Sequence, residues 1–171
     1  MIVYCDVFSG DELYSDGFNI TQEGCMDVIK GRMVEKGSND YGIAANADED
    51  AGENAQGEGL DATVERVIDV VDNFQLQEQA FTKNEYMAHI KGYMKRMVEH
   101  LQKENPERIE AFKVEATAFV KKVIAEFKNI TFYSGQSNDI DNGCVVVCIY
   151  GEDGMTPYFY FFRDGMRAEK Y

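Results

Sequence analysis

The chain has 171 residues, of which 44% are hydrophobic and 12% aromatic, so it is long enough for one domain with a real core and too apolar to be disordered throughout. Its net charge of −14 argues against a general binder of nucleic acid or anionic membranes, because phosphate groups attract basic surfaces. The N-terminus lacks the basic start and long apolar run of a secretory signal, and no stretch approaches the roughly 18 apolar residues of a membrane span. We therefore expect a cytoplasmic protein.

The first part of the chain is predicted to contain strands. Segments 2–8, 25–34 and 64–76 are rich in valine, isoleucine and aromatic residues. In the last of them, four apolar residues fall on one face at a period of two, namely Ile68, Val70, Phe74 and Leu76. This alternation is typical of half-buried strands.

Two helices are predicted over residues 82–128. The first opens at Thr82, because Glu85 stands three residues later and each side chain can satisfy the other's free backbone N–H. It ends near Glu104, after which Asn105 can cap a second helix with Pro106 at its first position. Apolar residues recur at steps of three and four in both: Met87, Ile90, Met94, Met97 and Leu101, then Ile109, Phe112, Ala116, Phe119, Val123 and Phe127. Such stripes predict a hairpin packed on a sheet.

Strands return after Asn129. Unbroken apolar runs at 130–134, 144–150 and 157–162 indicate strands buried on both faces, and Asp-Gly pairs within 152–155 and 163–166 suit hairpin turns. We expect both ends of the chain to meet in one sheet system. The order of elements predicts an α+β fold.

The four cysteines show no CxxC pair, so the spacing of a structural zinc site is absent. Four residues along a strand would separate Cys144 from Cys148 by about 13 Å, beyond the roughly 7 Å reach of a disulfide. We expect reduced thiols, and a thiol role for Cys5 or Cys25 stays open, because reactivity depends on local pKa and exposure.

Catalysis is not expected. His89 and His100 lie about 16 Å apart on one helix, too far to share a metal, and we interpret both as helix-surface residues. The sequence contains no nucleophile-elbow, P-loop or dinucleotide-binding glycine pattern. We therefore predict neither an enzyme nor a required cofactor.

Several strings in chain order carry a family resemblance: "MIVYCDVFSGDELYSD", "IAANADED", "VIDVVDNFQLQEQAFTK", "FKNITFYSGQS", "EDGMTPYFYFFRDGM" and "EKY". Together they resemble the translationally controlled tumour protein (TCTP) family, relatives in fold of a zinc-containing chaperone of nucleotide-free Rab GTPases. The resemblance implies a single domain over 1–171 with an Mss4-like fold. Its parts are a tent-like, strongly bent mixed β-sheet, a protruding antiparallel helical hairpin at about 82–128 and a long flexible acidic loop at about 40–65.

Three positions depart from the family pattern. Gln136 follows Gly135 where the family usually has Glu, Asp48 replaces a usual Ser, and Tyr171 stands where mammalian members end in Cys. The first change removes an expected carboxylate and the second makes the loop more acidic. The third excludes a dimer bridged at that position.

The acidic stretch 46–61 is a candidate calcium site. It contains six acidic residues, several glycines and no basic residue, and calcium prefers oxygen ligands. Neither register, from Asn46 or from Asp48, places Gly and Glu where an EF-hand loop needs them. The resemblance implies weak binding, for which the candidates are Asp48, Asp50, Glu53 and Glu58. The alternative is a solvated tether between two strands.

The predicted hairpin is basic while the rest of the chain is acidic. Residues 83–128 contain ten Lys and Arg and seven Glu, giving +3, so the remainder carries −14 − 3 = −17. The resemblance implies microtubule association here, in a multi-partner binding protein that supports growth and survival. The candidates are Lys91, Lys95, Arg96, Lys103, Arg108, Lys113 and Lys122. The alternative is that these cations only solvate the outer helix faces.

The resemblance also implies a small-GTPase surface, as an exchange factor or chaperone-type regulator. It comprises Glu12, Lys121 and the turn of Gly135 and Gln136. Asp11 and Glu12 also fit a polar turn between two strands, and Gln136 weakens the assignment because it lacks a charge. A redox-sensitive chaperone that uses free thiols is a third possibility.

Overall fold

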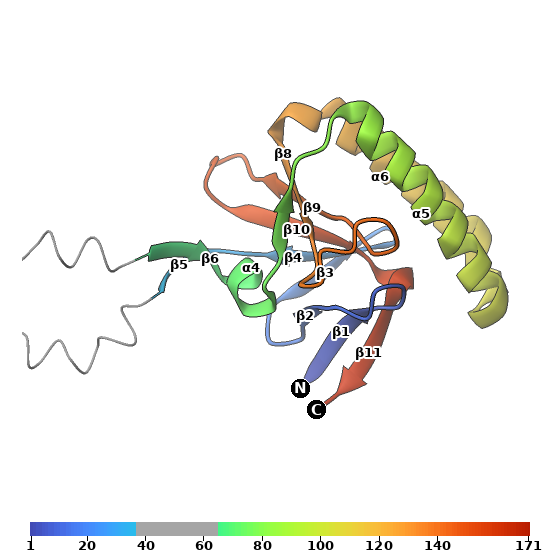
Figure 1. Cartoon of the computed structure of the whole chain (residues 1–171), viewed down its shortest axis with the longest axis horizontal. Coiled ribbons are helices and arrows are strands. Elements are labelled where there is room, and N and C mark those ends of the chain that lie inside the picture. The colour runs from blue at the N-terminus through green and yellow to red at the C-terminus, as the bar shows by residue number, and fades with distance from the viewer. Residues whose placement is uncertain (37–64) are drawn as a thin grey trace, which may run out of the picture.

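Figure 1 shows the computed structural model of the chain, which describes residues 1–36 and 65–171. One sheet, in the order β11-β1-β2, consists of β1 (Ile2–Asp6), β2 (Glu12–Ser15) and β11 (Met166–Lys170). The amino group of Met1 donates to the carbonyl oxygen of Tyr171 at 3.1 Å, and the two termini lie side by side in Figure 1. The prediction that both ends meet in one sheet is confirmed.

A central sheet of six strands has the order β3-β4-β10-β9-β8-β7. Its strands are β3 (Ile20–Glu23), β4 (Met26–Lys30), β7 (Gln77–Gln79), β8 (Ile130–Ser134), β9 (Val146–Tyr150) and β10 (Pro157–Phe162). A two-stranded ribbon pairs β5 (Met33–Lys36) with β6 (Glu65–Ile68). Every pairing among these described strands is antiparallel. Successive side chains of β9 and β10 are buried, as their apolar runs predict.

The predicted strand at 64–76 is wrong beyond Ile68, where the helix α4 (Asp69–Phe74) begins. The carboxylate of Asp69 accepts from the backbone N–H groups of Arg32 at 3.0 Å and Val70 at 2.8 Å, which anchors the start of the helix. Val70 is fully buried. Residues four apart, such as Val70 and Phe74, share a face in a strand and in a helix. The apolar spacing therefore fits both structures, and tertiary contacts select the helix.

Two further boundaries differ from the prediction. The strand expected at 25–34 is divided at Gly31, where a Cβ would lie 2.9 Å from the ring of Phe159, and the chain leaves the central sheet there. The Asp-Gly pair in 152–155 does connect β9 to β10. The pair in 163–166 instead forms the short 3₁₀ helix η3 (Arg163–Gly165), which carries the chain from the central sheet to β11.

The helices α5 (Lys83–Glu104) and α6 (Ile109–Ala125) form the predicted antiparallel hairpin, which projects along one side of the sheets in Figure 1. At the start of α5, the Thr82 hydroxyl accepts from the N–H of Glu85 at 3.1 Å, and the Glu85 carboxylate accepts from the N–H of Thr82 at 2.8 Å. Pro106 opens a 3₁₀ turn, η1 (Pro106–Arg108), but Asn105 makes no side-chain capping bond. The reciprocal cap is confirmed and the second cap is not.

Phe162 of β10 joins both helices to the central sheet. Its ring centroid lies 5.3 Å from that of Tyr93 on α5, and 6.2 and 5.8 Å from those of Phe112 and Phe119 on α6. All four side chains are buried. Aromatic burial of this kind contributes about 2–3 kcal/mol per ring, together with favourable ring geometry. The apolar stripes predicted for the two helices are therefore the faces that seat the hairpin.

His89 is not a simple helix-surface residue. Its ring lies between those of Phe81, at 6.1 Å, and Tyr93, at 6.0 Å. Its Nε2 atom is buried with no hydrogen-bond partner among the described residues. Burial, and then the positive charge of Arg96 about two turns along α5, lower the pKa of His89 to about 4. The folded protein therefore holds this imidazole neutral.

Asp27 on β4 is a buried carboxylate that links the two larger sheets. It accepts from the hydroxyl of Tyr14 on β2 at 2.6 Å and from the guanidinium of Arg163 on η3 at 3.3 Å. The ring of Tyr14 also stacks on that of Tyr4 at 4.7 Å. A buried charge needs such donors, because losing one leaves the carboxylate partly unsatisfied.

Replacing Tyr14 with Phe should lower the free energy of unfolding by about 2 kcal/mol, because it removes a hydrogen bond to a buried charge. Urea denaturation monitored by circular dichroism measures the change. Tyr4→Phe is the matched control, since it alters the stacked ring without touching Asp27, and should stay within about 0.5 kcal/mol of the parent. Equal effects of the two substitutions would contradict the role of the Tyr14 hydroxyl.

The low pKa of His89 predicts a pH-dependent stability. The unfolded chain binds a proton on His89 near pH 6.5, whereas the folded chain binds it only near pH 4. Stability is therefore fully present above pH 6.5 and is lost as the pH falls towards 4. Glutamine does not titrate, so the stability of His89→Gln should not change through this group. As the pH falls across this window, the free energy of unfolding of the parent should therefore drop relative to that of the variant by about 3 kcal/mol. Denaturant titrations at each pH measure both free energies of unfolding, and a difference between parent and variant that stays constant with pH would refute the prediction.

Candidate functional site

The cations predicted to bind microtubules divide into two groups, and three of them contact the body of the protein. Arg108 donates to the carboxylate of Asp164 at 2.8 and 3.0 Å, and Lys122 lies 3.3 Å from a carboxylate oxygen of Glu23. These contacts seat α6 beside the β3–β4 turn and η3. The hydrogen bond and charge of Asp164 raise the pKa of Arg108 above its ordinary value.

Arg96 makes the corresponding contact from α5. Its guanidinium donates to the backbone carbonyl of Asn142 at 3.0 Å and lies 5.7 Å from the ring centroids of Phe8 and Tyr93. Cation–π contacts of this kind contribute about 0.5–1 kcal/mol each. Arg96 therefore attaches α5 to the loop that follows β8 and to the β1–β2 turn.

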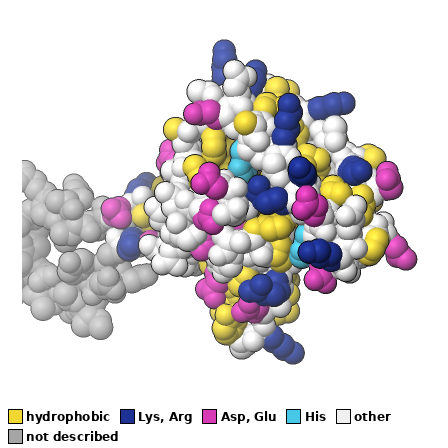
Figure 2. All heavy atoms as spheres, turned by 45° about the vertical axis from the view of Figure 1, so that its right-hand side comes forward, with side chains coloured by type: hydrophobic (Ala, Val, Ile, Leu, Met, Phe, Trp, Pro, Cys, Tyr) yellow, Lys and Arg dark blue, Asp and Glu magenta, His cyan; other side chains and the backbone are white. Residues whose placement is uncertain are grey.

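The other candidate cations point into solvent. Lys91, Lys95 and Lys103 of α5 and Lys113 of α6 are exposed. Within the described part of the chain, no acidic side chain forms an ion pair with any of these four. Figure 2 shows Lys and Arg side chains distributed over the face that carries the helices, with hydrophobic atoms between them. This solvent-facing set is the part of the predicted surface that can meet a partner.

The turn after β8 is held against the β1–β2 turn by Asp11. The Asp11 carboxylate accepts from the Ser137 hydroxyl at 2.7 Å and from its backbone N–H at 3.3 Å. Gly135 is buried directly beneath this carboxylate, since a Cβ there would lie 2.6 Å from the Cβ of Asp11, and Gln136 is exposed. The structure therefore brings together residues more than a hundred positions apart in the sequence.

Glu12 and Lys121 have different settings. Glu12 is exposed beside this turn, and its carboxylate accepts from the Tyr171 hydroxyl at 3.1 Å. Lys121 lies on another element, the outer face of α6, with Lys113 and Thr117. Glu12, Gly135 and Gln136 thus lie in one region, and Lys121 belongs to the hairpin.

The sequence interpretation did not single out Ser137, which holds the turn, or the small apolar residues on the outer face of α6. That face has a signal in the sequence, because Ala111, Val114, Ala118 and Ala125 also recur at helical steps. The larger apolar residues of the inner stripe obscured it. The hydrogen bonds of Ser137 have no comparable local signal.

The four cysteines are buried free thiols. Burial raises the pKa of Cys25, Cys144 and Cys148 to about 12 and also raises the pKa of Cys5. Since the thiolate is the reactive form, these sites lack the low pKa and exposure of a redox-sensing cysteine. The redox-sensitive chaperone therefore finds no support in the folded state.

The calcium candidates Asp48, Asp50, Glu53 and Glu58, and most of the predicted loop at 40–65, lie outside the described residues. Within 1–36 and 65–171, no three His, Cys, Asp or Glu side chains are grouped so as to hold a metal ion. None of the helices in the same residues is long and apolar enough to cross a membrane.

Known proteins are similar to this chain in both sequence and fold. The family model for translationally controlled tumour protein matches residues 1–167. The homologue from Schizosaccharomyces pombe is 44% identical over 174 residues, with 100% of each chain covered, and the human protein is 39% identical over 175 residues, with 99% covered. The solved structure of the S. pombe protein p23fyp superposes with a TM-score of 0.80 at 43% identity, covering 100% of both chains.

The solution structure of the Caenorhabditis elegans protein is similar at 29% identity, with a TM-score of 0.71 and coverage of 100% of this chain and 99% of that one. The agreement in sequence extends over the whole chain, and the agreement in structure includes the α+β, Mss4-like arrangement of sheets and hairpin. This chain therefore belongs to the translationally controlled tumour protein family.

Proposed function

We propose that this chain is a cytoplasmic, multi-partner binding protein that associates with microtubules through the solvent-facing lysines of its helical hairpin and supports growth and survival by recognition rather than catalysis. The observation that carries the proposal is a set of exposed lysines that form no ion pair with any described residue, on a projection of net charge +3 attached to a remainder of net charge −17. Acidic tails such as those of tubulin are the complementary partner.

The spacing of the lysines suits an extended acidic chain. Lys91 and Lys95 lie one turn apart on α5, and Lys103 is two turns further, so this lysine row extends about 18 Å along the helix axis and winds about a third of the way around it. Because these side chains are exposed, each contact with a carboxylate is weak, and several must act together. Binding of this type is fast, reversible and sensitive to salt.

Weak calcium binding belongs to the same proposal. It rests on the carboxylates of Asp48, Asp50, Glu53 and Glu58 in the sequence, and no further cofactor is proposed. An ion bound there would reduce the negative charge of a segment that is separate in sequence from the lysine row.

Regulation of a small GTPase is the second candidate function. The observation in its favour is the hydrogen bond from Ser137 to Asp11, which attaches the turn that contains the exposed Gln136 to the residue next to the exposed Glu12. An exposed carboxylate there can compete for the phosphate-binding lysine of an emptied nucleotide site or disturb its magnesium. Gln136 contributes hydrogen bonding without charge.

Reversing two charges on α5, in the variant Lys91→Glu/Lys95→Glu, should weaken co-sedimentation with microtubules about tenfold, because two attractive contacts become repulsive. Lys30→Glu/Lys170→Glu changes the net charge equally on exposed strand positions and should change binding less than about twofold. Binding of the parent should weaken as salt rises, since the screening length falls from about 10 Å at 0.1 M to about 3 Å at 1 M. Binding that ignores salt, or equal losses in both variants, would contradict this mechanism.

For the second candidate, Glu12→Ala should reduce the acceleration of nucleotide release from a GDP-loaded small GTPase by about tenfold, because the acidic group that competes in the nucleotide site is gone. Glu152→Ala, an exposed acid on the β9–β10 turn, is the control and should behave like the parent. Release driven by substoichiometric protein indicates an exchange factor, and stoichiometric capture indicates a chaperone. A Glu12→Ala variant as active as the parent removes Glu12 from the mechanism.

A further inference from the structure

The outer face of α6 differs in chemistry from the outer face of α5, although both meet the same solvent. On α5 the exposed positions are mainly Lys, Glu, Gln and Asn. On α6 the exposed positions include Ala111, Val114, Thr117, Ala118 and Ala125, and Val114 is 69% exposed. A β-branched residue is a poorer helix former than Ala, Lys or Glu, so helix stability does not explain its use at an exposed position.

These residues form one line along the helix. Ala111, Val114, Ala118 and Ala125 follow steps of three, four and seven residues, and Lys121 occupies the missing step between the last two. This is the spacing of a seam that packs against another helix, and its small side chains allow close approach. The inner stripe of α6, which includes Phe112 and Phe119, is already buried, so this seam is a second apolar face.

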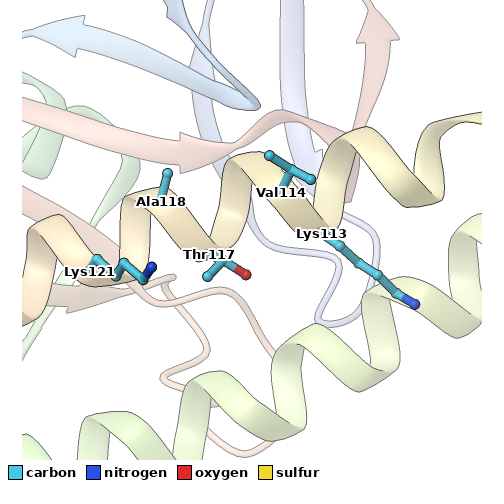
Figure 3. Close-up of a pocket in the computed structure, with 5 residues that line it drawn as sticks. All are labelled: Lys113, Val114, Thr117, Ala118 and Lys121. Atoms are coloured by element: carbon cyan, nitrogen blue, oxygen red, sulfur yellow. The ribbon is translucent and has the colours of Figure 1, made fainter.

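The seam is hollowed into a shallow groove lined by Lys113, Val114, Thr117, Ala118 and Lys121. In Figure 3, Val114 and Ala118 project from one side of the helix, while Lys113 extends from the other side towards α5. The two lysines are eight residues apart, about 12 Å along the axis. They therefore stand near the two ends of a small apolar strip.

The two lysines that line the groove favour an acidic occupant. Glu115 lies within 3.4 Å of Arg108, on the side of α6 that faces the body, so its charge is engaged there. Lys122 is likewise engaged with Glu23. No ion pair is formed by Lys113 or Lys121 within the residues that the structure describes. The groove thus presents two unpaired cations beside apolar atoms.

The geometry points to a docking site for an acidic amphipathic helix of a partner protein. Its apolar stripe would lie over Val114 and Ala118, and carboxylates two turns apart would reach Lys113 and Lys121. A second copy of this chain fits less well, because it would bring two hairpins of net charge +3 together. A membrane fits poorly, because the strip lacks large apolar or aromatic residues and the chain carries −14. This site lies on α6, shares Lys113 with the proposed microtubule-binding set, and does not use the lysines of α5.

The test uses three synthetic 18-residue peptides and the full ¹⁵N-labelled chain. The first peptide has leucines at helical steps flanked by glutamates. The second has the same composition with the leucines dispersed, and the third has lysines in place of glutamates. In an NMR titration, the first peptide should shift resonances of residues 110–125 and bind at least about tenfold more tightly than the other two.

Variants locate the contact. Val114→Glu and Lys113→Glu/Lys121→Glu should each weaken binding of the first peptide at least about tenfold, and Lys91→Glu/Lys95→Glu should change it less than about twofold. Val114 is exposed, so Val114→Glu should retain the parent's melting temperature, and Val114→Ala provides a milder variant if it does not.

Three results would overturn the proposal. The first is no binding of any peptide at millimolar concentration, and the second is equal binding of the dispersed peptide. The third is self-association of the parent in analytical ultracentrifugation that Val114→Glu abolishes, because it would identify a second copy as the occupant. Loss of microtubule binding in the α5 variant leaves this test unaffected, so failure of either idea can be told from failure of the other.

Discussion

The arrangement of this protein depends on three consecutive residues of η3, each of which contacts a different part of the fold. Arg163 donates to Asp27 and to the carbonyl of Gly24, which ties η3 to the β3–β4 region of the central sheet. Asp164 accepts from Arg108 at the tip of the hairpin. Gly165 lies under α5, where a Cβ would come within 2.6 Å of both the Tyr93 hydroxyl and the Met97 methyl group. A short segment between two sheets therefore also determines where the hairpin lies.

This constraint explains why the basic residues of the hairpin have two different roles. Arg96, Arg108 and Lys122 lie on helix faces that turn towards the body, and their charges meet carbonyls, carboxylates and aromatic rings there. Lys91, Lys95 and Lys103 are exposed along α5 and remain in solvent. The net charge of the hairpin overstates what is available to a partner, because part of it already stabilises the fold. The same rotation of α6 that buries Phe112 and Phe119 exposes Val114 and its neighbours.

Membership of the family establishes the fold, and a fold by itself does not establish a partner. The described surfaces differ in chemistry, so the proposed partners would use different ones. One is a lysine row on α5, another is the lysine-flanked groove on α6, and the third is the polar turn held by Asp11. Each relies on exposed side chains carried by a rigid element, so one partner need not rearrange the site of another. A protein with several such surfaces can act by recognition alone.

The sequence by itself determined the features that depend on near neighbours. The Thr82–Glu85 cap, the start of η1 at Pro106 and the buried runs of β9 and β10 involve residues a few positions apart, so local patterns were sufficient to predict them. Only the tertiary structure decided the helix at 69–74, because its apolar spacing suits a strand equally well. It also decided which cations of the hairpin contact the body of the protein and which polar turn is hydrogen-bonded to Asp11. Arg108 and Asp164 are 56 residues apart and Asp11 and Ser137 are 126 apart, and pairs at such separations are formed by the packing of sheets and helices, which no local pattern records.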